Sequence, residues 1–351
     1  MRIAILTDTH FGARNDSQQF LDYFLDFIEN QFLPECEKQN ITKILHLGDL
    51  MDRRKFVNYN TLNQVRERFF QRLQEKEMTM WCLIGNHDTY YKNTNNINSL
   101  RELFSDRFSC FVPIETPCVL DEFDGIKIGM VPWINKENEK ECVDFIHSCE
   151  ADILCGHFEL NGYEVMRGVK FENGMDPKIL SRFDRVLSGH FHTRHTKNNV
   201  HYLGTPYQIT FSDLNENKGF YILDTETKEL EFIKNNRKMF LSIEYYDKTF
   251  ETIDNFKDFE NKYIKLFVRE KKSQTKFDTF IENLYDAKVG SLTVIEDENN
   301  IEENIEVADM SLDTLTLIYK EAEDFYSSIE GIDVNKLKRL IQDIYMEALS
   351  E

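Results

Sequence analysis

The sequence predicts an α/β fold over roughly its first 225 residues, followed by smaller elements. In this part of the chain, short β-type runs alternate with helical stretches, as is typical of a sheet flanked by helices. Polar residues of metal-binding type follow most of the predicted strands, so we expect chemistry in loops at one rim of the sheet. The predicted strands are 2–7, 43–47, 80–84, 126–131, 152–154 and 185–187.

The length and composition suit a globular chain with more than one domain. A chain of 351 residues with 41% hydrophobic residues has material for two or three domains. We expect a main domain at 1–238, a small α+β accessory domain at 239–298, and an acidic linker with a helical tail at 299–351. The accessory domain should contain strands at 240–245, 263–268 and 289–295 and a helix capped by Ser273.

The tail is predicted to form two amphipathic helices beyond an acidic linker at 296–309. Such a helix pair could fold back on its own chain or dock in a groove on another protein. Two earlier helices, near 18–33 and 59–74, also carry apolar stripes, among them Phe20 and Phe24 in the first and Leu62 and Phe69 in the second. These stripes predict either broad core faces or the surface of a homodimer.

Neither a signal peptide nor a membrane span is predicted, because no apolar run approaches about 18 to 20 residues. The expected address is the cytoplasm, bacterial or that of a phage-infected host. The seven cysteines are odd in number and scattered without a Cys-x-x-Cys pair. They are therefore expected to be buried, reduced thiols.

Five short clusters carry the candidate chemistry, and all follow predicted strands. They are Asp8-Thr9-His10, Gly48 to Arg53, Gly85 to Asp88, Gly156-His157, and Gly189 to His192. Each is weak alone, but together and in order they predict one site. A mixture of carboxylates, imidazoles and one amide suits Mn²⁺, Fe²⁺ or Zn²⁺, and the lack of thiolate argues against a structural zinc. Asp49 could bridge two ions that hold a phosphate between them. The seven candidate ligands are Asp8, His10, Asp49, Asn86, His157, His190 and His192.

These clusters resemble the signature of the calcineurin-like metallophosphoesterases, D-x-H, G-D-x-x-D-R, G-N-H-D/E, G-H and G-H-x-H, over about the first 205 residues. The resemblance implies a β-sandwich flanked by helices and a site for two divalent ions, expected to be Mn²⁺. It also implies that His87 stays unligated, acts as an acid or stabilises the transition state, and is oriented by Asp52. The implied metal sets are Asp8, His10, Asp49 and His192 for one ion, and Asp49, Asn86, His157 and His190 for the other.

Two further features of the site region stay open. Arg53 matches the arginine of the signature and could bind substrate phosphate, but the run 53–55 could equally be a solvated basic turn. Tyr90 and Tyr91 lead into a polar loop where bases could stack, although core packing is the safer expectation for at least one of them.

Within the superfamily, the layout resembles SbcD-type DNA repair nuclease subunits, with T-even phage members the most similar in size. The residues that carry this resemblance are the clusters above together with 131–133, Phe158-Glu159 and 202–207. It implies an exonuclease and endonuclease acting on DNA in repair and recombination, with an SbcC-type coiled-coil ATPase bound through residues 310–351 and a homodimer formed through the two helices. Alternatives are a protein phosphatase or phosphodiesterase of the same superfamily, and a scaffold that binds DNA ends without cutting.

The net charge of −20 opposes unaided DNA binding, which draws on Lys and Arg. Residues 281–351 hold 18 acidic and 5 basic side chains, so most of the negative charge lies in the linker and tail. The preceding part carries about −7. Two divalent ions would offset about +4 of that where phosphate binds. Acidity therefore weakens DNA binding without excluding cleavage.

Overall fold

The computed structural model describes residues 1–166, 169–249, 253, 255–296, 336–337 and 340. The chain divides into two compact units, and each is described by itself. The first comprises 1–207 and 216–237, and the second comprises 208–215 and the described residues from 238 onward. The division at 237/238 lies one residue from the predicted boundary, whereas the loop 208–215 groups with the second unit. The predicted tail at 299–351 lies outside the described residues except for 336, 337 and 340.

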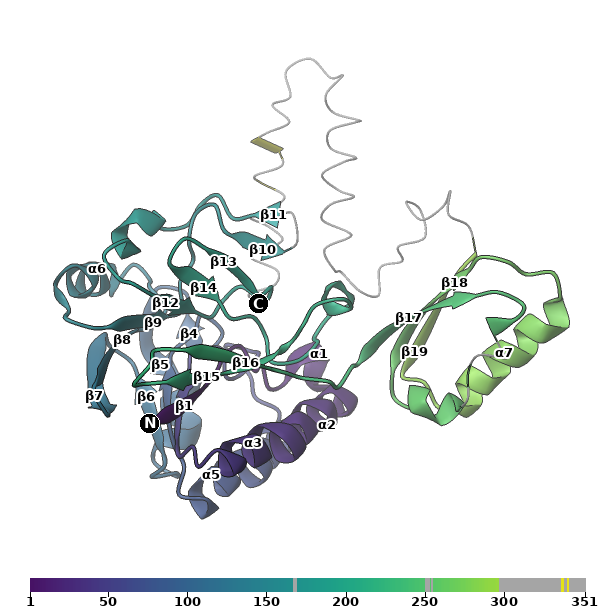
Figure 1. Cartoon of the computed structure of the whole chain (residues 1–351), viewed down its shortest axis with the longest axis horizontal. Coiled ribbons are helices and arrows are strands. Elements are labelled where there is room, and N and C mark those ends of the chain that lie inside the picture. Colours follow the sequence, from purple (N-terminus) through teal and green to yellow (C-terminus); the bar gives the residue numbers. More distant parts are fainter. Residues whose placement is uncertain (167–168, 250–252, 254, 297–335, 338–339, 341–351) are drawn as a thin grey trace. The chain divides into compact units, whose positions relative to one another are not determined.

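Two six-stranded sheets form the centre of the first unit (Figure 1). In each, the central strands run parallel; antiparallel strands close both edges of the second sheet but only one edge of the first, whose other edge strand pairs in parallel. The first sheet has the order β16 (Leu230–Lys234), β15 (Gly219–Asp224), β1 (Arg2–Leu6), β2 (Lys43–His46), β3 (Thr79–Leu83) and β6 (Phe111–Ile114). The second has the order β13 (His195–Lys197), β14 (Val200–Tyr202), β12 (Val186–Ser188), β9 (Ile153–Gly156), β8 (Ile126–Val131) and β7 (Cys118–Phe123).

One apolar core joins the two sheets face to face. Ile5 and Leu45 of the first sheet share it with Ile128 and Leu187 of the second, and all four side chains are buried. A sheet that is buried on both faces needs near-continuous apolar strands, which β1 and β3 supply. The unit is therefore the predicted α/β sandwich.

Helices cover the outer faces of both sheets (Figure 1). On the first sheet, Phe32 packs on Phe220 of β15 and Phe70 packs on Phe111 of β6. On the second, Ile146 of α6 (Glu139–Ser148) shares a core with Leu154 of β9. The first sheet is covered by α2 (Gln18–Phe27), η1 (Ile28–Phe32), α3 (Leu33–Lys38), α4 (Tyr59–Val65), η2 (Arg66–Phe70), α5 (Gln71–Glu75) and η3 (Arg101–Ser105).

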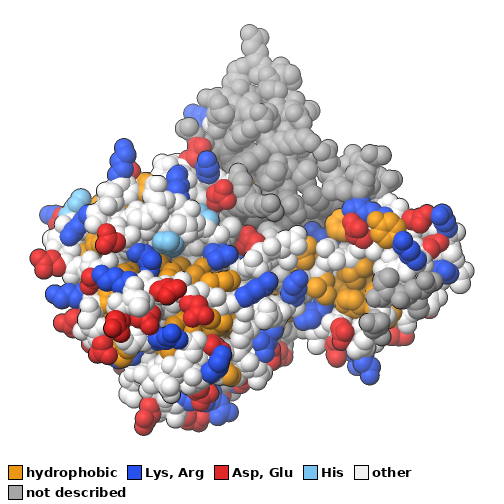
Figure 2. Space-filling model, in the orientation of Figure 1, with side chains coloured by type: hydrophobic (Ala, Val, Ile, Leu, Met, Phe, Trp, Pro, Cys, Tyr) orange, Lys and Arg blue, Asp and Glu red, His pale blue; other side chains and the backbone are white. Residues whose placement is uncertain are grey.

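The apolar stripes of the helices near 18–33 and 59–74 are core faces. Phe20, Phe24 and Phe69 are fully buried and Leu62 is 6% exposed within the single chain. These apolar side chains therefore belong to the core of the single chain, as the first of the two interpretations expects. A homodimer formed through these helices stays a prediction. Figure 2 shows acidic and basic side chains interspersed over the visible face of this unit, without a large patch of either sign.

The remaining elements of the first unit are short. They are α1 (Ala13–Asp16), the hairpins β4 (Thr89–Tyr91) with β5 (Thr94–Asn98) and β10 (Glu164–Met166) with β11 (Val169–Lys170), and the turn η4 (Pro177–Leu180). The stretch α1 contains a left-handed turn, since Arg14 and Asn15 both have φ of 58°. All seven cysteines are free, and six of them are buried, as predicted. No helix among the described residues is long and apolar enough to cross a membrane.

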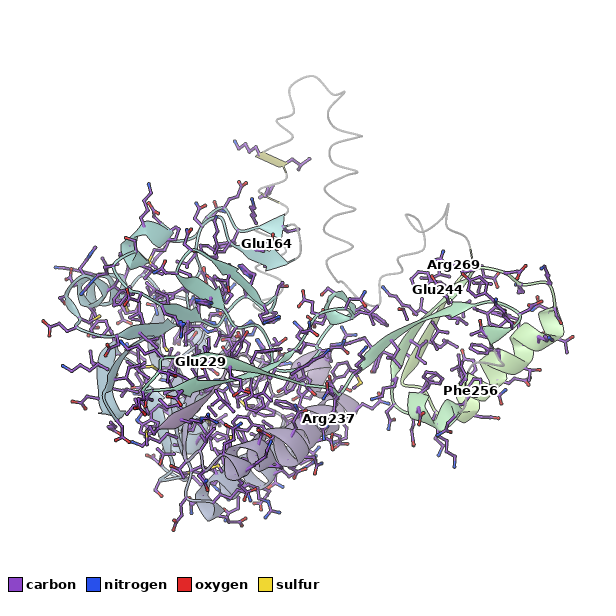
Figure 3. All side chains as sticks on the ribbon, viewed as in Figure 1. Glu164, Glu229, Arg237, Glu244, Phe256 and Arg269 are labelled. Carbon is purple, nitrogen blue, oxygen red and sulfur yellow. The ribbon has the colours of Figure 1, made fainter. Side chains whose placement is uncertain are left out.

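The second unit contains a parallel three-stranded sheet, β17 (Phe240–Tyr245), β18 (Tyr263–Val268) and β19 (Ser291–Ile295), with α7 (Gln274–Asp286). Ser273 caps α7 by accepting a hydrogen bond from the amide of Lys276. Phe256 of η7 (Phe256–Phe259) packs on Phe280 of α7 within an apolar core. Arg269 pairs with Glu244 on the surface, at 3.3 Å (Figure 3). The short turn η5 (Phe211–Asp213) also belongs to this unit.

Candidate metal centre

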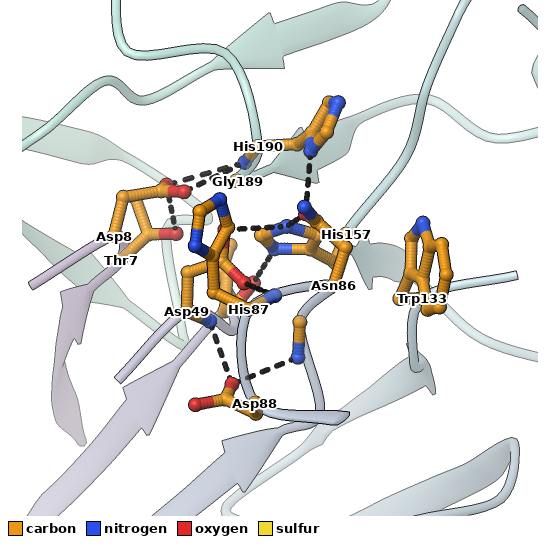
Figure 4. A network of polar contacts seen from close by, with 12 residues as sticks. Thr7, Asp8, Asp49, Asn86, His87, Asp88, Trp133, His157, Gly189 and His190 are labelled. Atoms are coloured by element: carbon orange, nitrogen blue, oxygen red, sulfur yellow. Dashed lines mark hydrogen bonds and ion pairs between the residues drawn. The ribbon is translucent and has the colours of Figure 1, made fainter. Parts of the chain in front are cut away.

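The five sequence clusters meet at one edge of the first unit, where parallel strands of both sheets end (Figure 4). Asp8 follows β1, Asp49 follows β2 and Asn86 follows β3, while His157 follows β9 and His190 follows β12. Carboxyl ends of neighbouring parallel strands lie at the same edge, and the two sheets face each other. Residues separated by about 180 positions in the sequence thus become neighbours.

One group of ligand-type atoms surrounds His10. Its Nε2 lies 3.0 Å from His192 Nε2, 3.9 Å from Asp8 Oδ1 and 3.8 Å from Asp49 Oδ2. Asp8 is fully buried and His10 is 1% exposed. These atoms converge from three loops, those that follow β1, β2 and β12.

A second group surrounds Asn86. Its Oδ1 lies 3.0 Å from His157 Nε2 and 2.9 Å from His190 Nδ1. Asp49 Oδ2 lies 3.3 Å from the same His157 nitrogen. Asp49 therefore lies between the two groups, which is the position that a bridging carboxylate would need.

The donor set fits a pair of divalent ions. His10 and His192 face each other through ring nitrogens, and at most one proton can lie between them. His190 Nε2 is buried without a hydrogen-bond partner, although Glu159 Oε1 lies 3.7 Å away. Imidazole, carboxylate and amide oxygen are ligands of Mn²⁺, Fe²⁺ and Zn²⁺. Among the described residues, three groups of acidic or imidazole residues bring ligand atoms within 4.8 Å of one another. They are Asp8 with His10 and His192, Asp49 with His157 and His190, and His10 with Asp49 and His87.

The loops hold these side chains at the cost of backbone strain. Asp8, His10, Asp49 and His190 all have positive φ, at 51°, 44°, 55° and 85°. This left-handed region is disfavoured for residues with a Cβ, and such strain clusters where a site requires it.

Glycines precede the site residues because no Cβ would fit there. A Cβ on Gly85 would lie 2.1 Å from Asp49 Oδ1, and one on Gly189 would lie 2.2 Å from Thr7 Oγ1. Gly48 has a φ of 100°, and its Cβ would lie 2.5 Å from His157 Nδ1. The glycines of the motifs therefore permit close approach between loops.

Buried carboxylates raise the pKa values of two imidazoles of the site, those of His10 and His157. Burial alone would lower the pKa of His10, but the nearby carboxylate of Asp52 and the charge of Asp49 outweigh burial and raise the pKa to about 9. Burial likewise opposes the charge of His157, yet Asp49 raises that pKa to about 9. For Asp49 itself, burial would raise the pKa, whereas the charges of His157 and His87 hold it well below its ordinary value.

The structure brings His87 and Asp52 together, but through the backbone. His87 Nδ1 donates to the main-chain carbonyl of Asp52 at 2.5 Å, so Nδ1 carries the proton. The Asp52 carboxylate instead lies 3.3 Å from His10 Nδ1. A carboxylate that fixes the other nitrogen of a metal-binding imidazole orients the ring. The expected carboxylate–His87 pair is therefore replaced by a carboxylate–His10 pair.

The guanidinium of Arg53 binds side chains of the turn at 13–16. Its Nη1 lies 3.4 Å from Asp16 Oδ2, and its Nη2 donates to Asn15 Oδ1 at 2.7 Å. Tyr90 and Tyr91 are 39% and 49% exposed, so neither is a core residue. The core-packing expectation for at least one of the two tyrosines is wrong.

Sequence reasoning missed the role of Asp88. Its carboxylate accepts main-chain N–H bonds from Asp49, Met51 and Gly85 at 2.8, 3.1 and 3.0 Å, and it also accepts from Leu50. Burial, followed by the charge of Asp49, raises its pKa. Asp88 thereby joins two site loops, which the fourth position of the third cluster alone did not reveal.

Lys218 was also missed, since it belongs to no cluster. This buried lysine donates from Nζ to the carbonyl of His192 at 2.9 Å and pairs with Glu216 at 2.8 Å. It fixes the loop that carries His192. An isolated lysine in a strand region gave no signal in the sequence.

The chain is similar in sequence to known proteins. Residues 1–194 match the calcineurin-like phosphoesterase family. Exonuclease subunit 1 of Enterobacteria phage T4 is 32% identical over 349 residues, which cover 99% of this chain and 99% of that protein. The SbcD component of the SbcCD nuclease of Staphylococcus epidermidis is 24% identical, over 66% of this chain and 67% of that protein. The DNA double-strand break repair protein Mre11 of Sulfurisphaera tokodaii is 28% identical, over 55% of this chain and 49% of that protein.

The full-length similarity, the family match and the paired ligand groups agree with one another. The chain belongs to the calcineurin-like phosphoesterase family, as a metal-dependent phosphodiesterase of the group that contains the SbcD and Mre11 nucleases.

Proposed function

We propose that this chain is a manganese-dependent DNA exonuclease and endonuclease subunit that hydrolyses phosphodiester bonds at DNA ends, in repair or recombination. The observation that carries the proposal is the convergence of six further ligand-type side chains around Asp49, with Asp49 Oδ2 3.3 Å from His157 and 3.8 Å from His10. Similarity to an exonuclease subunit over 99% of the chain supports DNA as the substrate.

Asp49 would be shared by two metal positions. Its Oδ2 faces both His10 and His157, while its Oδ1 accepts from the His87 amide. A neutral amide would supply no charge at this shared position. When bound, two divalent ions would supply the charge that polarises a phosphodiester and the acidity that activates an attacking water. Asp8, His10 and His192 would complete one position, and Asn86, His157 and His190 the other.

His87 would serve the leaving oxygen. Its Nδ1 donates to the Asp52 carbonyl, which leaves Nε2 for the substrate. Burial lowers the pKa of His87, so the free imidazole is neutral near pH 7. The negative charge of an arriving phosphodiester favours its protonated form. His87 could then donate the proton from Nε2 to the oxygen that leaves phosphorus.

The partner would be an SbcC-type coiled-coil ATPase, docked through residues 310–351. The sequence of this segment carries the amphipathic pattern of two helices. A basic surface on the partner would compensate the 18 acidic residues that the chain holds at 281–351. Deleting 310–351 should abolish complex formation and spare metal-dependent hydrolysis of small phosphodiesters. Retained complex formation would refute the docking segment.

The substrate is tested by incubating the Mn²⁺-loaded chain with linear DNA and, separately, with a phosphoprotein. We expect DNA cleavage, with or without the ATPase partner, and no release of phosphate from protein. An absence of DNA cleavage under both conditions would refute the nuclease proposal. Phosphate release from the phosphoprotein would point to a phosphatase of the same family.

A further inference from the structure

Two adjacent arginines at the site have different environments. Arg53 is held by Asp16 and Asn15, as described above. Arg54 has no carboxylate oxygen within 4.0 Å among the described residues, and its buried Nε has no hydrogen-bond partner. A guanidinium offers five donors, and leaving buried donors unmatched costs free energy. Arg54 is therefore the arginine with donors available to an anion.

Two bridges fix Arg54 beside one half of the metal centre. Its guanidinium carbon lies 5.2 Å from the centre of the Trp133 ring, and the Trp133 indole N–H donates to Glu159 Oε1 at 2.8 Å. The same Glu159 oxygen lies 3.7 Å from His190 Nε2. Stacking of a guanidinium on an aromatic ring orients it without using its N–H donors.

The second bridge runs through Thr89. Arg54 Nη1 donates to Thr89 Oγ1 at 3.3 Å, and this hydroxyl donates to the carbonyl of Asn86 at 3.1 Å. Thr89 is fully buried, so the link is rigid. Both bridges end at residues of the Asn86, His157 and His190 half of the site. Arg54 also interacts electrostatically with Asp49, the shared carboxylate.

A pocket lies on the open side of Arg54. It has a volume of about 170 Å³, and its lining, which is mostly apolar, includes Met51 and Ser99, both Arg53 and Arg54, and the acidic Glu102. Its wall connects to the metal centre, because Asp88 holds both the Met51 amide and the Ser99 hydroxyl. A phosphate placed near Asn86 and His190 would therefore lie on the side of the site where Arg54 opens to this pocket.

We propose that Arg54 binds a phosphate oxygen of the DNA at the Asn86 and His190 side of the metal centre, and that Trp133 and Glu159 hold it in place. The proposal rests on the phosphodiesterase function proposed above. It transfers the substrate-binding role from Arg53 to its neighbour. A fixed guanidinium binds phosphate through two parallel charge-assisted hydrogen bonds, which a lysine could not reproduce.

The test compares Arg54→Ala, Arg54→Lys and Arg53→Ala, with the exposed Arg72→Ala on α5 as a control for the loss of one positive charge. We expect Arg54→Ala to raise KM for linear DNA about tenfold to a hundredfold, with the stoichiometry of Mn²⁺ binding and the Tm near those of the unmodified chain. Arg54→Lys should give an intermediate KM, because it keeps the charge and loses the fork.

A readout that is independent of turnover is DNA binding by the metal-free protein in EDTA, measured by fluorescence anisotropy at several salt concentrations. Arg54→Ala should lower the magnitude of the slope of log K against log salt by about 1, the change expected for the loss of one phosphate contact. Arg72→Ala should leave the slope unchanged. An unchanged KM and slope in Arg54→Ala, or a larger effect of Arg53→Ala than of Arg54→Ala, would overturn the proposal.

Failure of the DNA function is separable from failure of this assignment. Bis(p-nitrophenyl) phosphate serves as a small diester that needs no DNA contact. If the unmodified chain hydrolyses this diester and not DNA, the nuclease function fails, and the role of Arg54 is then decided by KM for the small diester. A raised KM in Arg54→Ala supports phosphate binding, and an unchanged KM refutes it.

Discussion

The edge loops of the first unit and the core of the second unit differ in buried charge and in backbone strain. In the edge loops, Asp8 and Asp49 are buried charges held at positive φ. Among the described residues of the second unit, those other than glycine at positive φ are Asn261 and Lys288, both exposed, and the core is apolar around Phe280. Buried charge and strained backbone both cost folding free energy. The molecule accepts that cost at the edge where the candidate site lies, which indicates that function rather than stability shaped those loops.

The largest effect on activity should come from His87, which lies beside His10 and Asp49 and is proposed to act as the acid rather than as a ligand. His87→Ser removes the proposed proton donor, and we expect cleavage to fall about 10²-fold to 10⁴-fold while Mn²⁺ binding is retained. Single-turnover cleavage together with calorimetric Mn²⁺ titration measures both. His147→Ser, an exposed change on α6, is the matched control. Unchanged cleavage in His87→Ser would show that the acid role is misassigned.

A smaller effect should follow from loosening the loops without touching a proposed ligand. Asp88→Asn replaces an acceptor of main-chain N–H bonds from Asp49, Met51 and Gly85 by a group with one acceptor and one donor. We expect Mn²⁺ affinity to drop about 10-fold to 100-fold, as for other residues that orient ligands. Calorimetric titration provides the measurement, with the exposed Asp144→Asn as control. Equal affinity in the two variants would contradict the role of Asp88.

The buried charges should also make metal binding depend on pH. In the metal-free chain the pKa values of His10 and His157 are raised to about 9, so both hold a proton at pH 7. Since only a neutral imidazole binds a metal, protons must leave, and affinity should increase from pH 6 to about 9. The rise is about tenfold per pH unit for each displaced proton.

Proton release can be counted by titrating Mn²⁺ at pH 7 in buffers that differ in ionisation enthalpy. The observed heat should depend on the buffer, and that dependence should fade above pH 9. A flat affinity from pH 6 to 9 would mean that the imidazoles are already neutral.

The smallest effect on activity should come from Phe280→Ala, although this substitution should strongly destabilise the second unit. Phe280 is fully buried and packs on Tyr245 and Phe256. Phe280→Ala should destabilise that unit by about 3 to 5 kcal/mol, measured by urea unfolding. Hydrolysis of bis(p-nitrophenyl) phosphate should stay within twofold of the unmodified chain. A parallel loss of this activity would show that the edge loops depend on the second unit.

The sequence predicted those parts of the site in which residues of metal-binding type directly follow predicted strands. Asp8, Asp49 and Asn86 follow strands in clusters whose donor types belong together, so their convergence could be predicted without coordinates. The elements of the second unit were predictable for a similar reason, since β17 and β18 fall at the expected ranges. In both cases a local pattern determines the structure.

The features that escaped prediction depend on how loops turn. The carbonyl of Asp52 contacts His87 while its carboxylate contacts His10, and spacing alone cannot distinguish these. Spacing also cannot distinguish Arg53 from Arg54. Arg53 contacts Asp16 in the turn at 13–16, and Arg54 contacts Trp133. For the apolar stripes of the helices near 18–33 and 59–74, the sequence periodicity predicted an apolar face. It could not predict whether the core of the same chain or another chain covers that face.

The central claim is that Asp49 joins two metal positions in one site. Electron paramagnetic resonance of the Mn²⁺-loaded chain tests it most directly, with the metal content measured on the same sample. We predict two Mn²⁺ ions per chain and an exchange-coupled signal, which Asp49→Asn should abolish. A single ion per chain, or two uncoupled ions that are unaffected by Asp49→Asn, would contradict a bridged pair.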